Sequence, residues 1–129
     1  GEGATKFVTI RVQGGKTPKQ AYLIANSVAT SSLVKTALFG EDPNWGRMFC
    51  AVGNAGTPFD PNKVDILLNK NLLLKNGNPT NLSSQKLVKA MQQHAINITI
   101  DLNDGNEWEE VMTCDFSYDY VKINAEYTT

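Results

Sequence analysis

Two runs of alternating apolar and polar residues, near opposite ends of the chain, constrain the fold most strongly. In residues 96–102 isoleucine or leucine occupies every second position, and asparagine, threonine and aspartate stand between them. Residues 7–12 repeat the pattern, with Val8, Ile10 and Val12 as the apolar positions. A period of two predicts β-strands that bury one face and expose the other. The chain is therefore expected to contain a sheet with one covered face.

Helix signals lie between these strands. Thr17 is followed by Pro18 and Gln20, the pattern of a capped helix start. A polar step at residues 30–32 predicts that this helix breaks or restarts. Residues 39–46 read as a loop, and residues 47–52 as a short helix with Gly53 as a left-handed terminator. A further helix, capped by Ser83 or Ser84, is expected to end near residue 94.

Shorter apolar runs complete the expected sheet. Residues 64–68 and 72–74 read as strands, and residues 76–79 as a turn. Asp104–Gly105 predicts a hairpin whose returning strand is 108–116, and a helix at 118–125 is expected to follow. We predict an α+β fold in a single domain, residues 1–129, with a small, largely antiparallel sheet and about three helices on one face.

Charge and composition exclude several classes of function. The 129 residues carry 12 lysines and arginines against 13 acidic residues, and 41% are hydrophobic. A balanced charge with no basic run predicts no nucleic-acid partner. No apolar run approaches the ~20 residues of a membrane span, so no membrane partner is expected. A small zwitterionic ligand fits this balance.

The cysteines and the histidine suggest no metal centre. Cys50 and Cys114 are far apart in sequence, and His94 is the only histidine. Zinc sites need a closer cluster of ligands, so we expect no metal. Two buried, reduced thiols are predicted instead, which indicates a reducing compartment. A position near a helix C-terminus accounts for His94 better than a catalytic Ser–His pair does.

Three stretches follow neither helical nor strand periodicity: GEGATK at 1–6, TALFGEDPNWGR at 36–47, and the segment from Cys114 to Thr129. Residues outside core patterns more often serve binding or chemistry. Glu2 stands between two glycines, which let a ligand approach the backbone closely. Asn124 and Thr129 offer both hydrogen-bond donors and acceptors.

These three stretches, in order and over essentially the whole chain, resemble the bifunctional ornithine acetyltransferase/glutamate N-acetyltransferase family of arginine biosynthesis. The resemblance implies transfer of an acetyl group from N-acetylornithine to glutamate through an acetyl-threonine intermediate, without a cofactor. Family members are similar to N-terminal-nucleophile enzymes, in which a new N-terminal threonine attacks. The chain begins at Gly1 and has no such threonine. We therefore expect the C-terminal portion of the β subunit, with no catalytic residue of its own.

The same resemblance assigns substrate binding to Glu2, Asn124 and Thr129. The expected ligands are N-acetylornithine, ornithine, glutamate and N-acetylglutamate, and the expected protein partners are the remaining α and β segments of the enzyme in a hetero-oligomer. The pocket must accept a side-chain ammonium and a side-chain carboxylate in turn, which favours neutral polar groups such as those of Asn124 and Thr129. We expect a cytoplasmic location, or the mitochondrial matrix in a eukaryote.

Other charged residues leave alternatives open. Arg47 suits a bidentate carboxylate contact and Trp45 a pocket wall, but a rigid loop capped by Asp42 and Asn44 explains the motif equally. Lys6 and Lys35 are interpreted as surface or supporting charges rather than catalytic amines. A related N-terminal-nucleophile amidohydrolase or aminopeptidase, or an inactive assembly fragment, remains a possible alternative function.

Overall fold

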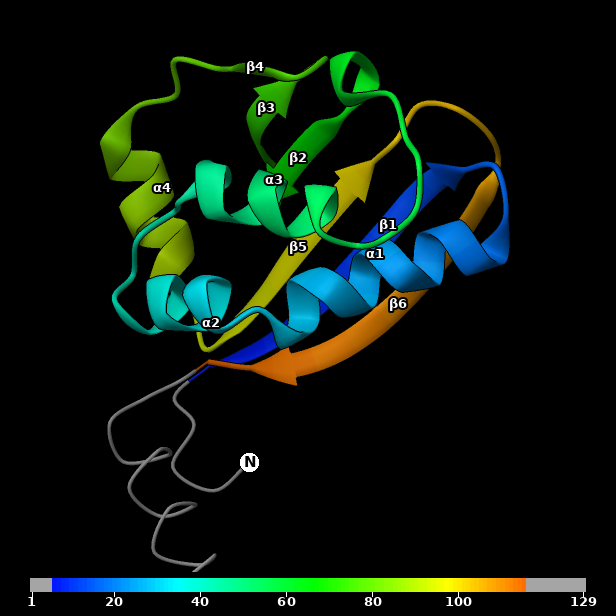
Figure 1. Ribbon diagram of the computed structural model, residues 1–129. Coiled ribbons are helices and arrows are strands. Elements are labelled where there is room, and N and C mark those ends of the chain that lie inside the picture. The colour runs from blue at the N-terminus through cyan, green and yellow to red at the C-terminus, as the bar shows by residue number, and fades with distance from the viewer. Residues whose placement is uncertain (1–5, 116–129) are drawn as a thin grey trace, which may run out of the picture.

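The computed structural model describes residues 6–115, which form a six-stranded sheet with helices packed against one face (Figure 1). The strand order is β4-β3-β2-β5-β1-β6; β1 and β5 are parallel, and the other pairs are antiparallel. The strands are β1 (Phe7–Gly15), β2 (Asp65–Leu68), β3 (Asn71–Lys75), β4 (Asn78–Pro79), β5 (Ala95–Asp101) and β6 (Glu107–Cys114). The predicted α+β class with a largely antiparallel sheet is confirmed.

Four α-helices and one short 3-10 helix lie within residues 6–115. They are α1 (Pro18–Thr30), α2 (Ser32–Phe39), α3 (Trp45–Gly53), η1 (Pro61–Lys63) and α4 (Ser84–Met91). The expected caps Thr17 and Ser83 are present, and Ser31 caps α2; each accepts a backbone N–H from the first turn of its helix. A side-chain cap of this kind stabilises a helix by about 1 kcal/mol. The polar step at Ser31 therefore ends α1 and starts α2, as predicted.

The two alternating runs form the centre of the core. Val8, Ile10 and Val12 of β1 stand beside Ile96, Ile98 and Ile100 of β5, and all are at most 1% exposed. Helices α1 and α3 lie across this face of the sheet (Figure 1). Truncating one of these isoleucines to alanine would cost about 2–5 kcal/mol. This packing fixes the strand ends that carry the charged groups described below.

The predicted hairpin between β5 and β6 is wrong. Strand β6 pairs with β1, which lies between β5 and β6 in the sheet. Both edges of β5 are already occupied, by β1 and β2, so the chain crosses the end of β1 before it returns. Asn103 adopts a left-handed conformation with φ 51°, and the N–H of Asp104 donates to the carbonyl of Gly14. The Asp-Gly pair therefore turns the chain over β1 instead of closing a two-stranded hairpin.

Two smaller predictions need adjustment. Helix α3 begins at Trp45 and ends with Asn54 as its C-cap at φ −87°, so Gly53 is not a left-handed terminator. The first glycine with positive φ beyond the helix is Gly56. The helix expected at 118–125 lies outside the described residues.

Candidate functional site

The candidate site lies at the end of the sheet where β1 begins and β6 ends. The backbone N–H of Lys6 donates to Oδ1 of Asp115 at 3.2 Å, and the N–H of Asp115 donates back to the Lys6 carbonyl at 3.3 Å. The N–H of Phe7 also donates to the carbonyl of His94 at 2.8 Å. Residues 1–5 and 116–129 therefore join the described body at adjacent positions. Glu2, Asn124 and Thr129 lie in these outer segments and outside the described residues.

Lys6 differs from the sequence interpretation of a surface charge. Its side chain is only 6% exposed, and its ammonium lies 3.8 Å from Oε1 of Glu41, whose side chain is 44% exposed. Lys6 precedes Val8, Ile10 and Val12 in the same alternation, so its side chain points to the covered face of the sheet. Asp115, which holds the Lys6 backbone, is fully buried. A cation and a carboxylate are thus buried together at this end.

The loop between α2 and α3 supplies Glu41. This residue has φ 55°, a left-handed conformation that is uncommon for a side chain other than glycine or asparagine. Asn44 caps α3 through the N–H of Arg47 at 3.0 Å and donates from Nδ2 to Asp42 at 3.1 Å. These contacts agree with the rigid-loop interpretation of the motif.

Arg47 and Trp45 do not form a carboxylate pocket among the described residues. The guanidinium of Arg47 donates to the carbonyl of Leu33 at 3.0 Å and contacts the Thr36 hydroxyl at 3.4 Å. Arg47 therefore ties α3 to α2. Trp45 is 37% exposed and lies at the start of α3.

The predicted pair of buried thiols is half correct. Cys50 and Cys114 are not joined in a disulfide, and Cys50 is exposed whereas Cys114 is buried. Cys50 lies on α3 and lines an apolar groove of about 370 Å³ together with Gly46 and Gly53. His94 packs edge-on against the ring of Phe7, with centroids 5.0 Å apart. His94 therefore contributes to packing at the start of β1.

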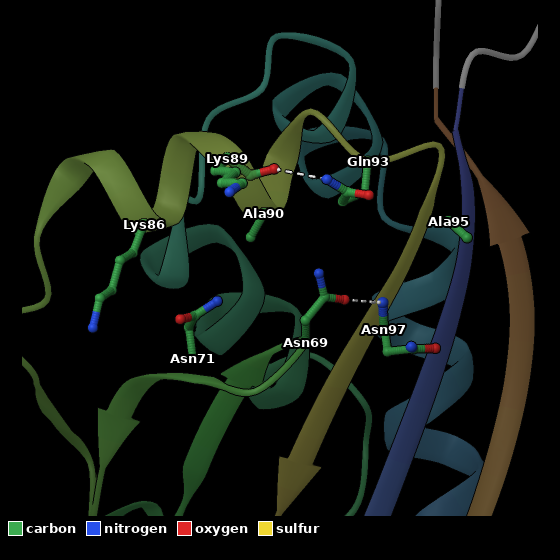
Figure 2. A pocket seen from close by; sticks show the side chains of 8 residues that line it. All are labelled: Asn69, Asn71, Lys86, Lys89, Ala90, Gln93, Ala95 and Asn97. Carbon is green, nitrogen blue, oxygen red and sulfur yellow. Dashed lines mark hydrogen bonds between the residues drawn. The ribbon is translucent and has the colours of Figure 1, made fainter.

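A polar hollow of about 520 Å³ lies between α4 and the start of β5 (Figure 2). Its lining consists of amide, lysine and alanine residues: Asn69, Asn71, Lys86, Lys89, Ala90, Gln93, Ala95 and Asn97. Several amides already have backbone partners; Oδ1 of Asn69 accepts from the N–H of Asn97 at 2.9 Å, for example. Both lysines are exposed on α4. The hollow adjoins the candidate site, because Ala95 pairs with Phe7.

The opposite end of the sheet contains tightly paired charges. Asp104 binds Lys63 at 3.0 Å and Lys16 at 3.3 Å, and Asp65 binds Lys75 at 3.1 Å. The hydrogen bond between Lys63 and Asp104 is the main reason that the pKa of Lys63 lies above its ordinary value and that of Asp104 below.

Asp65 is the most buried carboxylate of this paired group. Burial raises the pKa of Asp65, but hydrogen bonds from the Asn76 N–H and from the Asn103 and Lys75 side chains outweigh it, so the net pKa is lowered. The N–H of Asn76 donates to Oδ1 at 2.8 Å. Asp65 and Asp104 are therefore held as structural anions.

Within residues 6–115, no three histidine, cysteine or acidic side chains come together in a way that would hold a metal ion. No helix in the same range is long and apolar enough to cross a membrane.

The sequence model of the ArgJ family matches residues 1–129. The chain belongs to this family. Its similarity to the "Arginine biosynthesis bifunctional protein ArgJ" of Desulfotalea psychrophila is 51% identity over 98% of the chain and 33% of that protein. The corresponding "mitochondrial" protein of Schizosaccharomyces pombe is 44% identical over 98% of the chain and 30% of its own length. The chain thus spans about a third of these relatives.

The fold agrees with a solved member of the ArgJ family. The crystal structure of the Bacillus halodurans protein "argJ" is 37% identical, with a TM-score of 0.93, over 98% of this chain and 60% of that chain. The family resemblance inferred from the three motifs is therefore correct.

Sequence reasoning missed the burial of Lys6. The signal was available, because Lys6 occupies the even-numbered face of β1 with Val8 and Ile10. A lysine is rarely buried without a partner, and position alone did not reveal that Glu41 would come close. That contact depends on where the loop after α2 returns to the sheet.

Proposed function

We propose that this chain forms part of a bifunctional enzyme that transfers an acetyl group from N-acetylornithine to glutamate. Membership of the ArgJ family and the names of the relatives support the reaction. The observation that supports the assignment of the site is the pair of hydrogen bonds between Lys6 and Asp115, one to the Asp115 carboxylate and one between backbone groups. Lys6 and Asp115, the described residues nearest in sequence to Glu2 and to Asn124 and Thr129, therefore lie side by side.

In this proposal the chemistry uses a threonine from another part of the enzyme. Its hydroxyl attacks the acetyl carbonyl of N-acetylornithine, forms an acetyl ester and releases ornithine; the amine of glutamate then takes the acetyl group. Glu2 pairs with the side-chain ammonium of N-acetylornithine. Asn124 and Thr129 bind either substrate through groups that donate and accept hydrogen bonds. The contribution of this chain is positioning, which lowers the barrier without bond-making by its own residues.

The partners follow from the same assignment. The chain, as a single domain, assembles with the remaining α and β segments of the enzyme, and the assembled protein is a hetero-oligomer in the cytoplasm, or in the mitochondrial matrix of a eukaryote. Its ligands are N-acetylornithine, ornithine, glutamate and N-acetylglutamate.

Acetyl transfer by the complete protein tests the reaction. We expect N-acetylornithine to be consumed with stoichiometric formation of N-acetylglutamate when glutamate is present. Release of free acetate at the same rate without glutamate would instead identify an amidohydrolase.

Substitution of Glu2 tests the site. Glu2→Gln in the complete protein removes a charged hydrogen bond, so kcat/KM for N-acetylornithine should fall about ten- to a hundredfold. The matched control is Glu107→Gln, an exposed position at the start of β6, which should leave kcat/KM unchanged. A Glu2→Gln enzyme with wild-type kcat/KM would remove Glu2 from the site.

A further inference from the structure

Among the described residues, Lys6 is a buried cation with fewer close partners than burial normally requires. Its side chain is 6% exposed, although lysine is among the residues least often buried. Removing an ammonium from water is costly unless it is paired and hydrogen-bonded. The contacts of the Lys6 ammonium therefore indicate whether a further anion is accommodated at this end of the sheet.

The contact with Glu41 is longer than a hydrogen bond. Among the described residues the structure gives the Lys6 ammonium a single ion pair, 3.8 Å from Oε1 of Glu41. Charge-assisted hydrogen bonds between an ammonium and a carboxylate are about 2.7–2.9 Å long. The lysines at the other end of the sheet approach their carboxylates to 3.0, 3.1 and 3.3 Å. Within residues 6–115, the contacts of the Lys6 ammonium therefore leave hydrogen-bonding capacity for an additional anion.

Hydrogen bonds fix the backbone from which the Lys6 side chain extends. Asp115 bonds both the N–H and the carbonyl of Lys6, and the N–H of Phe7 bonds the carbonyl of His94. On the other side, Glu41 is held in a left-handed conformation, with its N–H donating to the carbonyl of Leu38 at 3.2 Å. Strained conformations of this kind persist where the surroundings enforce them and are common at binding sites. A cation held in one place is suited to binding one group of a ligand in a defined position.

We propose that Lys6 binds the α-carboxylate of the amino-acid substrates, an inference that rests on the proposed acetyltransferase function. N-acetylornithine and glutamate differ at the side-chain end, but both carry an α-carboxylate. A single fixed cation therefore serves both halves of the reaction. Glu41 holds the ammonium in place from the solvent side.

The position of Lys6 along the chain suits this role. Glu2, proposed to bind the side-chain ammonium of N-acetylornithine, precedes Lys6 by four residues. Four residues span at most about 14 Å. In this proposal Glu2 binds the side-chain ammonium of N-acetylornithine and Lys6 binds its α-carboxylate, so both charged groups are bound by the GEGATK motif.

A comparison of two substrates isolates the proposed contact. N-acetylputrescine is N-acetylornithine without its carboxylate. The wild-type complete protein should use it about ten- to a hundredfold less well, by kcat/KM, than N-acetylornithine. In the Lys6→Met variant, kcat/KM for N-acetylornithine should fall by a similar factor, and discrimination between the two substrates should disappear. Lys6→Arg, which keeps the charge, should preserve part of the discrimination.

The control variant is Lys75→Met, at the opposite end of the sheet. It breaks the ion pair with Asp65, so it should lower the melting temperature and leave discrimination intact. Equal use of both substrates by the wild-type protein, or unchanged discrimination in Lys6→Met, would overturn the role of Lys6. If Lys6→Met does not fold, the wild-type and Lys6→Arg measurements decide the question by the same criterion. A wild-type protein that forms no N-acetylglutamate from N-acetylornithine would instead overturn the proposed function itself.

Discussion

The two ends of the sheet bury or shield charges in different ways. At the end where β1 finishes, Asp104 and Asp65 bind lysines at 3.0–3.3 Å, and Asp65 also accepts a backbone N–H at 2.8 Å. At the end where β1 begins, the more deeply buried Lys6 has its described partner at 3.8 Å. The better-compensated charges are thus the more exposed ones.

This difference separates a stabilising role from a binding role. Closely paired and hydrogen-bonded charges favour the folded state. A buried charge that lacks close partners lowers the stability of the folded state unless a ligand of opposite charge pairs with it. Stability given up in favour of binding is characteristic of functional sites. We therefore expect substitutions at the paired end to change stability and those at the Lys6 end to change substrate use.

Among substitutions at the paired end, the largest effect on stability is expected for Gly14→Ala. Gly14 has φ +67°, and an added Cβ would meet the Asp101 carboxylate and come within 2.7 Å of the Asn103 backbone nitrogen. Backbone strain together with the clash should cost about 2–4 kcal/mol. The matched control is Gly53→Ala, where a Cβ meets nothing within 4 Å. Thermal unfolding should show a large loss for the first variant only; equal melting temperatures would contradict the close packing around Gly14.

Asp65→Ala should cost about 2–3 kcal/mol of folding free energy, because it leaves the N–H of Asn76 and the ammonium of Lys75 without their anion. The KM for both amino acids should stay at the wild-type value. Thermal unfolding and steady-state kinetics on the same preparation provide the check. A raised KM with unchanged stability would reverse the roles assigned to the two ends.

Deleting Thr128–Thr129 from the complete protein should remove one hydroxyl contact with the substrate. The binding free energy of both amino acids should weaken by about 0.5–1.5 kcal/mol, and their KM values should rise accordingly. The melting temperature should change little. A truncated enzyme with normal KM values, or one that does not fold, would show that the proposed role of Thr129 is wrong.

The smallest effects concern pH. The pKa values of Asp65 and Asp104 lie below the ordinary value of 3.8, so their stabilisation is complete above pH 3.8 and is lost as the pH falls through the lowered values. For Lys63, with a pKa raised above 10.5, the contribution is present below pH 10.5 and is lost at higher pH. Replacing Asp65 and Asp104 by asparagine should flatten the acid limb of a plot of melting temperature against pH. An unchanged acid limb would show that these pairs do not contribute.

The sequence predicted the parts of the fold that depend on local patterns. The alternation in β1 and β5 and the caps Thr17 and Ser83 specify elements through neighbouring residues, and these predictions were correct. The order of strands depends on long-range pairing. The Asp104–Gly105 turn is compatible with a hairpin, and only the occupied edges of β5 exclude it.

The candidate site divides in the same way. The three motifs were sufficient to identify the family, because they match it in residues and in order over essentially the whole chain. The burial of Lys6 follows from its register on β1, but its distance from Glu41 follows from the return of the loop after α2. The alternation of residues in β1 does not predict the distance between Lys6 and Glu41.

A crystal structure of the complete protein with bound N-acetylglutamate tests the central claim most directly. We expect the ligand at the end of the sheet where β1 begins, with its α-carboxylate within hydrogen-bonding distance of the Lys6 ammonium and with Asn124 and Thr129 in contact. A ligand bound in the hollow beside α4, or at the Asp104 end, would contradict the account.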